Sequence, residues 1–305
     1  MNEFELIRHY FDRRQSVPGV IVGVGDDGAV LAPDPNTDQC QVIDTLVEGV
    51  HFPVGTDPAD IAYRSVVVNL SDIAAMGGRP RWMTLALTLT DASESWLGAF
   101  SSGLFAAADK YNVVLVGGDT TRGDSVVVTI AMSGEVEKGC ALLRSGATPG
   151  DTIFVTGTPG DAAAGLALLQ QREANEYLVG RFLRPTPRLE TGRKLVGKAS
   201  AVIDISDGLV GDLGKLLQAS GAGAEISIDR LPLSDALRAR FDVDKQRRFA
   251  LTGGDDYELC FAANADSVVE LAGITAIGKV TESTALLCLL NGDVVEVDDS
   301  GYRHF

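Results

Sequence analysis

The order of helix-like and strand-like segments is the feature that most constrains how this chain can fold. Residues 57–76 and 93–111 have the apolar spacing of helices, and strand patterns cover 82–90, 113–116 and 125–135. The strands often follow one another in neighbouring pairs, so they do not alternate regularly with single helices. A chain of this order favours an α+β fold of mixed α/β layers over a doubly wound parallel sheet.

Two turn-rich stretches, 137–139 and 145–151, divide the chain, with a short strand expected at 141–144 between them. With 305 residues, the chain is long enough for two domains of ordinary size. We predict an N-terminal domain at 1–137 and a C-terminal domain at 138–305. The second is expected to contain strands at 152–157, 201–205, 224–228 and 258–262, and helices at 162–171, 209–219 and 234–240.

Composition limits the classes of function open to the chain. Hydrophobic residues make up 45% of it, so a packed globular core is expected. The formal net charge is −16, which argues against nucleic acid or an anionic membrane surface as a partner, because both require a basic face. The four cysteines lack CxxC spacing, as expected of reduced, buried thiols. Without an apolar signal core or membrane span, we expect a soluble, cytoplasmic protein.

Six short acidic motifs carry most of the information about function. Nearly all adjoin glycine or small polar residues, and most end an apolar run, where a strand gives way to a loop. Carboxylates gathered there repel one another unless a cation lies between them, and oxygen ligands suit Mg²⁺, which usually arrives with phosphates. The motifs predict a magnesium-dependent enzyme that uses a nucleotide. They are GDD at 25–27, DT at 44–45, NLSD at 69–72, GGDT at 117–120, DISDG at 204–208 and GGDD at 253–256.

Three of these motifs indicate a metal or phosphate site more specifically than the rest. Asp72 interrupts an apolar helix and needs a partner if it faces inward. Asp119 follows the strand 113–116 through two glycines, whose bare backbone lets a phosphate approach closely. Asp204 and Asp207 flank Ser206 at a junction between strand and helix, so the amide groups at the helix start are predicted to point at the site.

Other features are open to two interpretations. The GDDG turn at 25–28 suits a hairpin as well as a metal, and the loop at 157–161 suits a tight turn between strand and helix as well as a phosphate. His51 is either a ligand-contacting residue or a satisfied loop histidine. The basic side chains are candidates either for phosphate contact or for surface ion pairs; these are Arg144, Arg184, Arg188 and Lys279.

Taken together and in order, the motifs resemble the thiamine-monophosphate kinase family, of the aminoimidazole-ribonucleotide-synthetase-like ATP-binding superfamily. The resemblance runs from Phe4 to Phe305, essentially the whole chain. GDD-type motifs are shared with sister enzymes, whereas DPADIAYRSVVVNLSDIAAMG, VTGTPGDAAAGL and RFLRPTPR are more specific. The remaining matching segments are GVGDDGAVL, DTLVEGVHF, VGGDTTRG, IDISDGLVGDLG and LTGGDDYELCF.

The resemblance implies ATP-dependent phosphorylation of thiamine monophosphate to thiamine diphosphate, the last step in making that cofactor. It also implies an N-terminal domain that binds ATP and metal and pairs with its copy in a homodimer, and a C-terminal domain that completes the active site. The γ-phosphoryl group of ATP is expected to pass directly, in line, to the phosphate of the substrate, with charge neutralised by Mg²⁺.

Residue roles follow by position in the matching motifs. Several Mg²⁺ ions are expected on Asp27, Asp44, Asp72, Asp119, Asp204 and Asp207, of which Asp72, Asp119 and Asp207 are the predicted catalytic residues. ATP contacts are expected from Gly118, Asp119, Arg144 and Ser206, and substrate contacts from His51, Asp255 and Tyr302. The family often has two hydroxyl residues where Val42 and Ile43 stand, and commonly Glu where Asp255 stands.

Three alternatives remain open from the sequence. One is a sister enzyme of the superfamily, such as a ligase-like synthetase or a hydrogenase-maturation dehydratase that uses ATP. Another is a nucleotide or divalent-ion sensor without turnover, and the third is a magnesium-dependent phosphatase that needs no ATP. His51, Tyr302 and the segment 184–188 favour the thiamine kinase over the first alternative.

Overall fold

The computed structural model describes residues 3–13, 17–91 and 93–297. The chain divides into two compact units. The N-terminal unit comprises Met1–Ile73 and Gly78–Gly139, and the C-terminal unit comprises Ala74–Gly77 and Cys140–Phe305. The boundary predicted after residue 137 lies two residues before the end of the N-terminal unit. No helix among the described residues is long and apolar enough to cross a membrane.

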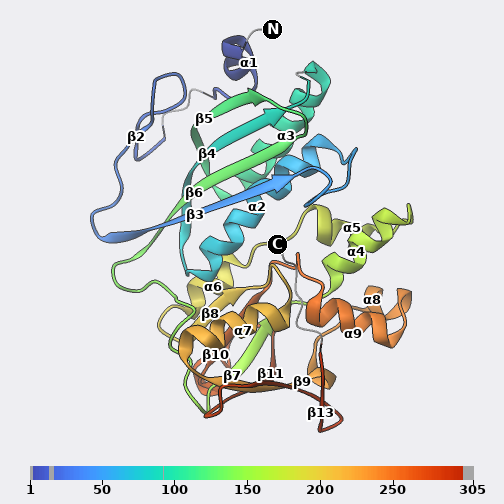
Figure 1. The fold of residues 1–305 in the computed structure, drawn as a ribbon. Helices are drawn as coiled ribbons and strands as arrows, with labels where there is room; N and C mark the ends of the chain where they lie inside the picture. The colour runs from blue at the N-terminus through green and yellow to red at the C-terminus, as the bar shows by residue number, and fades with distance from the viewer. Residues whose placement is uncertain (1–2, 14–16, 92, 298–305) are drawn as a thin grey trace. The chain divides into compact units, whose positions relative to one another are not determined.

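The N-terminal unit is built on a four-stranded sheet of order β3-β6-β4-β5 (Figure 1). Strands β3 and β4 each pair antiparallel with β6, and β4 pairs parallel with β5. Its strands are β1 Val20–Val22, β2 Val30–Leu31, β3 Thr37–Val47, β4 Arg79–Leu89, β5 Val114–Arg122 and β6 Val127–Glu137. Its helices are α1 Glu3–Tyr10, α2 Pro58–Ala75, whose last two residues belong to the C-terminal unit, and α3 Glu94–Tyr111.

Local sequence explains where the two long helices begin and end. Pro58 stands at the first position of α2, and the side chain of Asp57 accepts a hydrogen bond from the Ala59 amide at 2.8 Å. Ser93 caps α3 by accepting from the Trp96 amide, and Asn112 ends it in a left-handed conformation. Both helices lie behind the same face of the sheet in Figure 1.

The other face of this sheet carries small and β-branched side chains. Along β3, Cys40 and Leu46 are buried, whereas Ile43 is 67% exposed, as expected when successive side chains point to opposite faces. Thr45 on β3 forms a hydroxyl hydrogen bond with Thr129 on β6 at 2.8 Å. This surface is called the open sheet face below; its members include Gln41, Ile43, Thr45, Thr84, Ala86, Thr129, Ala131 and Ser133.

The C-terminal unit is built on a seven-stranded sheet of order β13-β12-β9-β11-β7-β10-β8, antiparallel throughout except for the parallel pair β12–β9. Its strands are β7 Thr152–Thr156, β8 Ala199–Asp204, β9 Gly223–Ser227, β10 Leu259–Ala263, β11 Ile274–Thr281, β12 Leu286–Leu290 and β13 Asp293–Val295. Its helices are α4 Asp161–Gln170, α5 Glu176–Leu183, α6 Leu189–Leu195, α7 Leu209–Ser220, α8 Asp235–Arg240 and α9 Val243–Thr252, with short 3₁₀ turns η1 Ile228–Arg230 and η2 Ala265–Ser267.

Two apolar clusters lie on opposite sides of this sheet. Strand β10 is buried on both faces: Cys260 belongs to the cluster that includes the leucines of α7, and Phe261 belongs to the cluster that includes Leu195 of α6. Because β10 is covered on both sides and pairs with β8, it helps to fix the position of the residues that follow β8. The largely antiparallel sheet confirms the expected α+β fold over a doubly wound one.

Several element predictions were wrong. Strand β5 does not end at Val116 but continues to Arg122, so Asp119 lies within it, because pairing with β4 outweighs the low strand propensity of glycine. Residues 141–144 form no strand. Helices α5 and α9 were missed. The apolar pattern of α9 is weak, and its start is fixed instead by Asp242, whose side chain accepts from the Lys245 amide.

Candidate functional site

The N-terminal unit brings two of the predicted metal ligands together. Asp44 lies on β3 and Asp72 near the end of α2, 28 residues further along the chain, and their side chains are hydrogen-bonded to each other. Burial raises the pKa of the Asp44 carboxyl above its ordinary value, and the hydrogen bond with Asp72 partly opposes that rise. Two carboxylates in contact require either a shared proton or a cation between them.

A third oxygen lies one helical turn before this pair. Asn69 is fully buried, and its Nδ2 donates a hydrogen bond to the Ser65 carbonyl at 3.0 Å. Its Oδ1 atom is buried without a hydrogen-bond partner. Because residues three apart on a helix share a face, this oxygen lies on the side of α2 that carries Asp72. Carboxylate and amide oxygens are ligands that Mg²⁺ accepts, so this set fits the expected metal.

Three further predicted residues line one cavity of the same unit. The cavity has a volume of about 370 Å³, and its walls include the turn 25–29 and the segment 117–120 of β5. Asp27, Gly118 and Asp119 therefore line the same cavity, although Asp27 is far from the other two in sequence. Packing also requires glycine at position 118, since an added Cβ atom would lie 2.0 Å from the Leu85 carbonyl oxygen on β4.

These carboxylates occur in pairs in the N-terminal unit. Asp44 contacts Asp72, and Asp27 and Asp119 line one cavity. Within residues 3–13, 17–91 and 93–297, no group of three or more His, Cys, Asp or Glu side chains is arranged to hold a metal ion. A metal on either pair therefore needs further oxygens from elsewhere, such as an amide, water or phosphate, as is usual for Mg²⁺.

His51 forms local hydrogen bonds in the loop after β3. Its Nδ1 atom accepts from the Val47 amide at 3.0 Å, and its own amide donates to the Val47 carbonyl at 2.9 Å. An Nδ1 atom that accepts a hydrogen bond carries no proton, which fixes the tautomer of the ring in this conformation. These contacts agree with one of the two interpretations offered by the sequence, that of a loop histidine whose hydrogen bonds are satisfied locally.

In the C-terminal unit, the segment 204–208 joins β8 to α7 and carries three predicted site residues. Asp204 is the last residue of β8 and is buried, whereas Ser206 and Asp207 are half-exposed. The amide of Gly208, predicted to point at the site, instead donates to the side chain of Asp212 at 3.2 Å. For the Gly208 amide that expectation was wrong, because a carboxylate of the same helix already satisfies it.

Asp207 is also engaged by a side chain that the sequence analysis did not single out. Lys215, two turns along α7, donates to Asp207 Oδ2 at 2.5 Å and to Asp212 Oδ1 at 2.8 Å. Burial raises the pKa of Asp212, while the hydrogen bond and charge of Lys215 oppose that rise. The spacing of Asp207, Asp212 and Lys215 is close to helical, which was the available sequence signal.

The GGDD motif packs directly against this segment. The Asp255 amide donates to the Ser206 carbonyl at 2.8 Å, and the Tyr257 amide donates to the Ile205 carbonyl at 2.8 Å. Gly254 has a φ of +69° and lies so close to Ser206 that a Cβ atom would be 2.7 Å from its carbonyl oxygen. The structure thus places the predicted nucleotide residue Ser206 beside the predicted substrate residue Asp255.

Two predicted residues are not brought into this group by any described contact. Arg144 lies in an exposed loop, where its carbonyl accepts from the Ser220 hydroxyl at 3.2 Å. Tyr302 lies outside the described residues.

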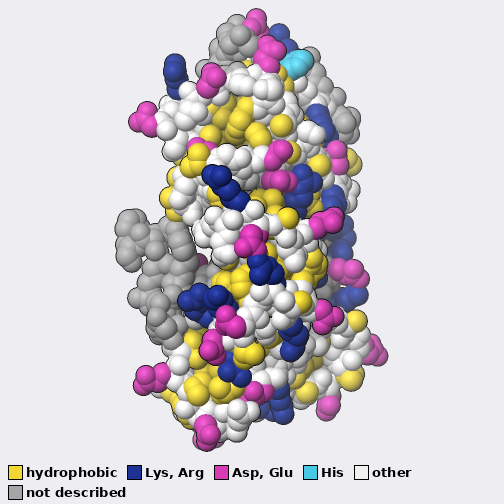
Figure 2. Space-filling view, turned by 90° about the vertical axis from the view of Figure 1, so that its right-hand side faces the viewer, with side chains coloured by type: hydrophobic (Ala, Val, Ile, Leu, Met, Phe, Trp, Pro, Cys, Tyr) yellow, Lys and Arg dark blue, Asp and Glu magenta, His cyan; other side chains and the backbone are white. Residues whose placement is uncertain are grey.

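The basic side chain of Lys279, a candidate for phosphate contact, donates to the Gly150 carbonyl at 3.3 Å. On the face of the molecule in Figure 2, basic and acidic side chains are interspersed.

The segment 184–188 is held by a buried acidic residue that the sequence analysis missed. Glu258 is fully buried and accepts hydrogen bonds from both Arg188 and Arg181, the latter at 2.8 Å, and from the Thr156 hydroxyl at 2.5 Å. Arg188, considered for phosphate contact, therefore forms a structural ion pair. Its sequence distance from Glu258 gave no signal of this contact.

The loop at 157–161 is a turn closed by a carboxylate. Asp256 is buried and accepts from the amides of Gly160 at 2.7 Å and Ala162 at 3.3 Å, so it caps α4. The amides at this helix start are thus already satisfied by a carboxyl group of the protein. Of the two interpretations, the tight turn between strand and helix accounts for the loop.

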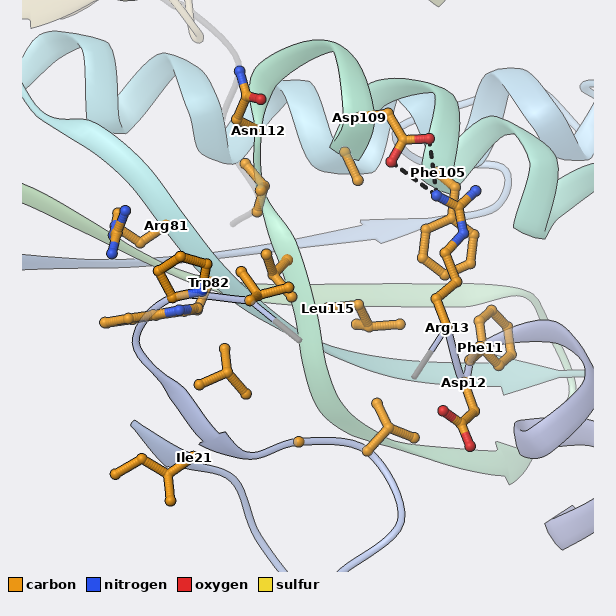
Figure 3. A pocket seen from close by; sticks show the side chains of 18 residues that line it. Phe11, Asp12, Arg13, Ile21, Arg81, Trp82, Phe105, Asp109, Asn112 and Leu115 are labelled. Atoms are coloured by element: carbon orange, nitrogen blue, oxygen red, sulfur yellow. Dashed lines mark hydrogen bonds and ion pairs between the residues drawn. The ribbon is translucent and has the colours of Figure 1, made fainter. Parts of the chain in front are cut away.

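A larger cavity, of about 660 Å³, adjoins the 370 Å³ cavity of the N-terminal unit, since Phe11, Val24 and Leu115 line both (Figure 3). Arg13 forms an ion pair with Asp109 at 2.8 Å at its edge and stacks on the ring of Phe105 at 3.5 Å. Trp82 and Leu115 line the apolar side. Among its described lining residues there is no predicted site residue, so size alone does not locate the chemistry.

Comparison with known proteins identifies related chains. Residues 25–136 match the N-terminal domain, and residues 148–287 the C-terminal domain, of AIR synthase related protein. Thiamine-monophosphate kinase of Escherichia coli (strain K12) is 47% identical over 319 residues, which cover 99% of this chain and 98% of the relative.

Solved structures agree with this relationship. The crystal structure of thiamine-monophosphate kinase from Stenotrophomonas maltophilia K279a is 43% identical, with a TM-score of 0.86 and coverage of 95% of this chain and 96% of the other. A structure of AaThiL complexed with AMPPCP and TMP is 32% identical, with a TM-score of 0.82 and coverage of 99% and 96%. Identity and coverage of this extent show that the chain belongs to the thiamine-monophosphate kinase family.

Proposed function

We propose that this protein phosphorylates thiamine monophosphate to thiamine diphosphate with ATP as the phosphoryl donor. The observation that carries the proposal is similarity over 99% of the chain to thiamine-monophosphate kinase of Escherichia coli. The related AaThiL structure, complexed with the ATP analogue AMPPCP and with TMP, supports both ligands. The reaction completes the biosynthesis of thiamine diphosphate.

The proposal includes Mg²⁺ held by clustered aspartates. Asp44 and Asp72 support it, because their contact leaves two carboxylates that a divalent cation would neutralise. The orphan oxygen of Asn69 adds a ligand of the right type. Bound Mg²⁺ would lower the repulsion between ATP and the acceptor phosphate. The full proposed set is Asp27, Asp44, Asp72, Asp119, Asp204 and Asp207, which lie in both units.

The chemistry requires little proton transfer from the protein. The acceptor phosphate is already ionised at neutral pH, so no strong general base is needed. The main obstacle is electrostatic: two unit charges 4 Å apart repel by about 4 kcal/mol at an effective dielectric constant of about 20. Asp72, Asp119 and Asp207 act, in this proposal, by holding and aligning positive charge for a direct in-line transfer without a phosphoenzyme.

Binding roles are assigned to the remaining predicted residues. In this proposal Gly118, Arg144 and Ser206 contact ATP, and His51, Asp255 and Tyr302 contact the substrate. The placement of Ser206 next to Asp255 supports neighbouring donor and acceptor contacts in the C-terminal unit. Asp255 is further oriented by the Tyr257 hydroxyl, which donates to its Oδ1 atom at 3.0 Å.

We also propose that the protein forms a homodimer through the open sheet face. That face presents aliphatic and hydroxyl side chains, including Ile43 at 67% exposure, on a sheet whose other face is covered by helices. A surface of mostly aliphatic and hydroxyl side chains that faces a second copy of itself can bury apolar area symmetrically about a twofold axis. A second copy of the same face supplies that match.

A product assay tests the reaction. Purified protein is incubated with ATP, Mg²⁺ and thiamine monophosphate, and the thiamine species are separated by chromatography, with free thiamine and ATP-free mixtures as controls. Thiamine diphosphate is expected only when ATP and the monophosphate are both present. Absence of this product with AMPPCP still bound would overturn the kinase assignment in favour of a sister enzyme or sensor. Phosphate release without ATP would indicate a phosphatase.

A further inference from the structure

One carboxylate in the C-terminal unit holds three consecutive backbone amides. Asp212 Oδ2 accepts from the amides of Ser206 at 2.9 Å, Asp207 at 2.9 Å and Gly208 at 3.2 Å. Asp212 is 1% exposed, so these hydrogen bonds are shielded from water. A single charged oxygen therefore sets the backbone of the segment that carries Ser206 and Asp207.

The second oxygen of Asp212 controls a side chain of that segment. Its Oδ1 atom accepts from Lys215 Nζ at 2.8 Å, and the same ammonium donates to Asp207 Oδ2 at 2.5 Å. Lys215 is 43% exposed at its side chain, while Asp207 is 35% exposed. The lysine thus connects the buried carboxylate to the half-exposed carboxylate of Asp207.

The backbone of the segment needs this restraint. Gly208 has a φ of +122°, and its missing Cβ atom would lie 2.9 Å from Thr252, so the turn is tight. Three amides in such a turn, left without acceptors, would lose hydrogen bonds that helix α7 cannot supply, because they precede its first turn. Asp212, at the fourth position of α7, is placed to accept all three.

We propose that Asp212 is a positioning residue: it presets the segment Ser206–Gly208 and, through Lys215, the carboxylate of Asp207, for nucleotide and metal binding. This inference rests on the proposed function. It assigns Asp212 no contact with the reacting groups. Asp212 instead fixes the position of residues that are proposed to make such contacts, in the way that residues around a metal site orient its ligands.

The test compares Asp212→Ala with Asp212→Asn, which retains one oxygen acceptor for the amides and loses the charge. The matched control is Asp151→Ala. Asp151 Oδ2 also accepts three hydrogen bonds, from the Thr148 amide at 2.9 Å, the Thr148 hydroxyl at 3.1 Å and the Ser200 hydroxyl at 2.7 Å. It holds a turn that carries none of the proposed site residues.

Two readouts are independent of turnover. Hydrogen–deuterium exchange of a peptide covering residues 204–212 reports on the amides, and calorimetry with AMPPCP and Mg²⁺ reports on binding. In Asp212→Ala we expect the peptide to exchange about 10-fold faster and AMPPCP to bind about 10-fold more weakly. Asp212→Asn should restore exchange and AMPPCP affinity most of the way to wild type. Asp151→Ala should change neither quantity.

Unchanged exchange in Asp212→Ala would overturn the proposal, as would faster exchange with unchanged AMPPCP affinity. If that variant does not fold, Lys215→Met carries the test, because the half-exposed lysine can be replaced while Asp212 Oδ2 still accepts from the three amides. We expect it to keep the exchange protection and to change the Mg²⁺ concentration needed for AMPPCP binding by about threefold or more. An unchanged Mg²⁺ requirement would contradict the link from Asp212 to Asp207.

These outcomes remain separate from the fate of the proposed function. Exchange is measured without substrate, so it decides whether Asp212 fixes the segment even if no thiamine diphosphate is formed. Loss of the proposed function appears instead as an inactive wild-type protein. A wild-type protein that is active, with Asp212→Ala indistinguishable from Asp151→Ala, overturns the positioning role alone.

Discussion

At the level of single residues, the contact between Asp44 and Asp72 shows how a helix interior accommodates a carboxylate. If this pair holds Mg²⁺, Asp72→Asn should lower turnover by roughly 100-fold and raise the Mg²⁺ requirement by about 10-fold, because a neutral amide attracts the cation less strongly. The measurement is initial rate against Mg²⁺ concentration. Asp109→Asn, at an exposed ion pair of the same unit, is the control. Kinetics equal to wild type would rule out a metal role for Asp72.

Asp256 gives a pH dependence whose sign follows from its burial. Burial raises the pKa of this carboxyl well above its ordinary value, and the amides of Gly160 and Ala162 oppose that rise. A group with a raised pKa in the folded state contributes stability that is present below the unfolded pKa of about 3.9 and lost as pH rises through the folded value. The free energy of unfolding of wild type, relative to Asp256→Asn, should therefore fall as the pH rises above about 4.

Asp242 provides the opposite case for the same denaturation experiment. A hydrogen bond from the Lys245 amide, together with the charge of that lysine, lowers the pKa of Asp242. Stability from such a group is present above the unfolded pKa and lost as pH falls through the folded value. The stability of wild type relative to Asp242→Asn should rise with pH. Parallel pH profiles for the two variants would contradict both assignments.

At the level of elements, the packing of α2 against α3 depends on one glycine. A Cβ atom at Gly103 of α3 would lie 2.0 Å from the carbonyl oxygen of Ala59 on α2, so the two backbones touch there. Gly103→Ala should force the helices apart and lower the free energy of unfolding by about 3 kcal/mol.

Gly98 on the same helix is the matched control for this prediction. An added Cβ atom there meets only Tyr10 at 3.9 Å, an ordinary contact. Gly98→Ala should stabilise the protein by up to about 1 kcal/mol, because alanine favours the helix. Urea denaturation measures both changes. Equal effects of the two substitutions would show that the close approach at Gly103 is unimportant.

For the whole molecule, the open sheet face makes a prediction about assembly. In sedimentation velocity, the wild-type protein should run as a dimer of the 32.1 kDa chain. Ile43→Glu should shift it to the monomer, because a charge at the centre of an apolar contact is costly to bury. Ile21→Glu is a control of equal exposure, 67%, because Ile21 lies on β1, outside the strands that form the open sheet face. A dimer that persists in Ile43→Glu would place the interface elsewhere.

Much of the fold could be predicted from local sequence because its signals are local. The apolar spacing of α2 and α3, with Asp57, Pro58 and Ser93 at their starts, specifies both helices within a residue or two. The α+β class followed from strands that come in neighbouring pairs. Strand β5 was cut short because the glycines at 117 and 118 favour a turn until a paired neighbour is present.

The acidic motifs by themselves determined which residues to suspect, since chemistry and glycine neighbours are visible in the sequence. The tertiary structure decided how they are used. It placed Asp44 against Asp72, assigned Arg188 to the buried Glu258, and gave the Gly208 amide to Asp212. The first two contacts could not be read from spacing alone, because a carboxylate or guanidinium pairs with any complementary partner, whereas Gly208 and Asp212 are only four residues apart. Only the paths of β3, α2 and β10 through the fold decide which partner comes within reach.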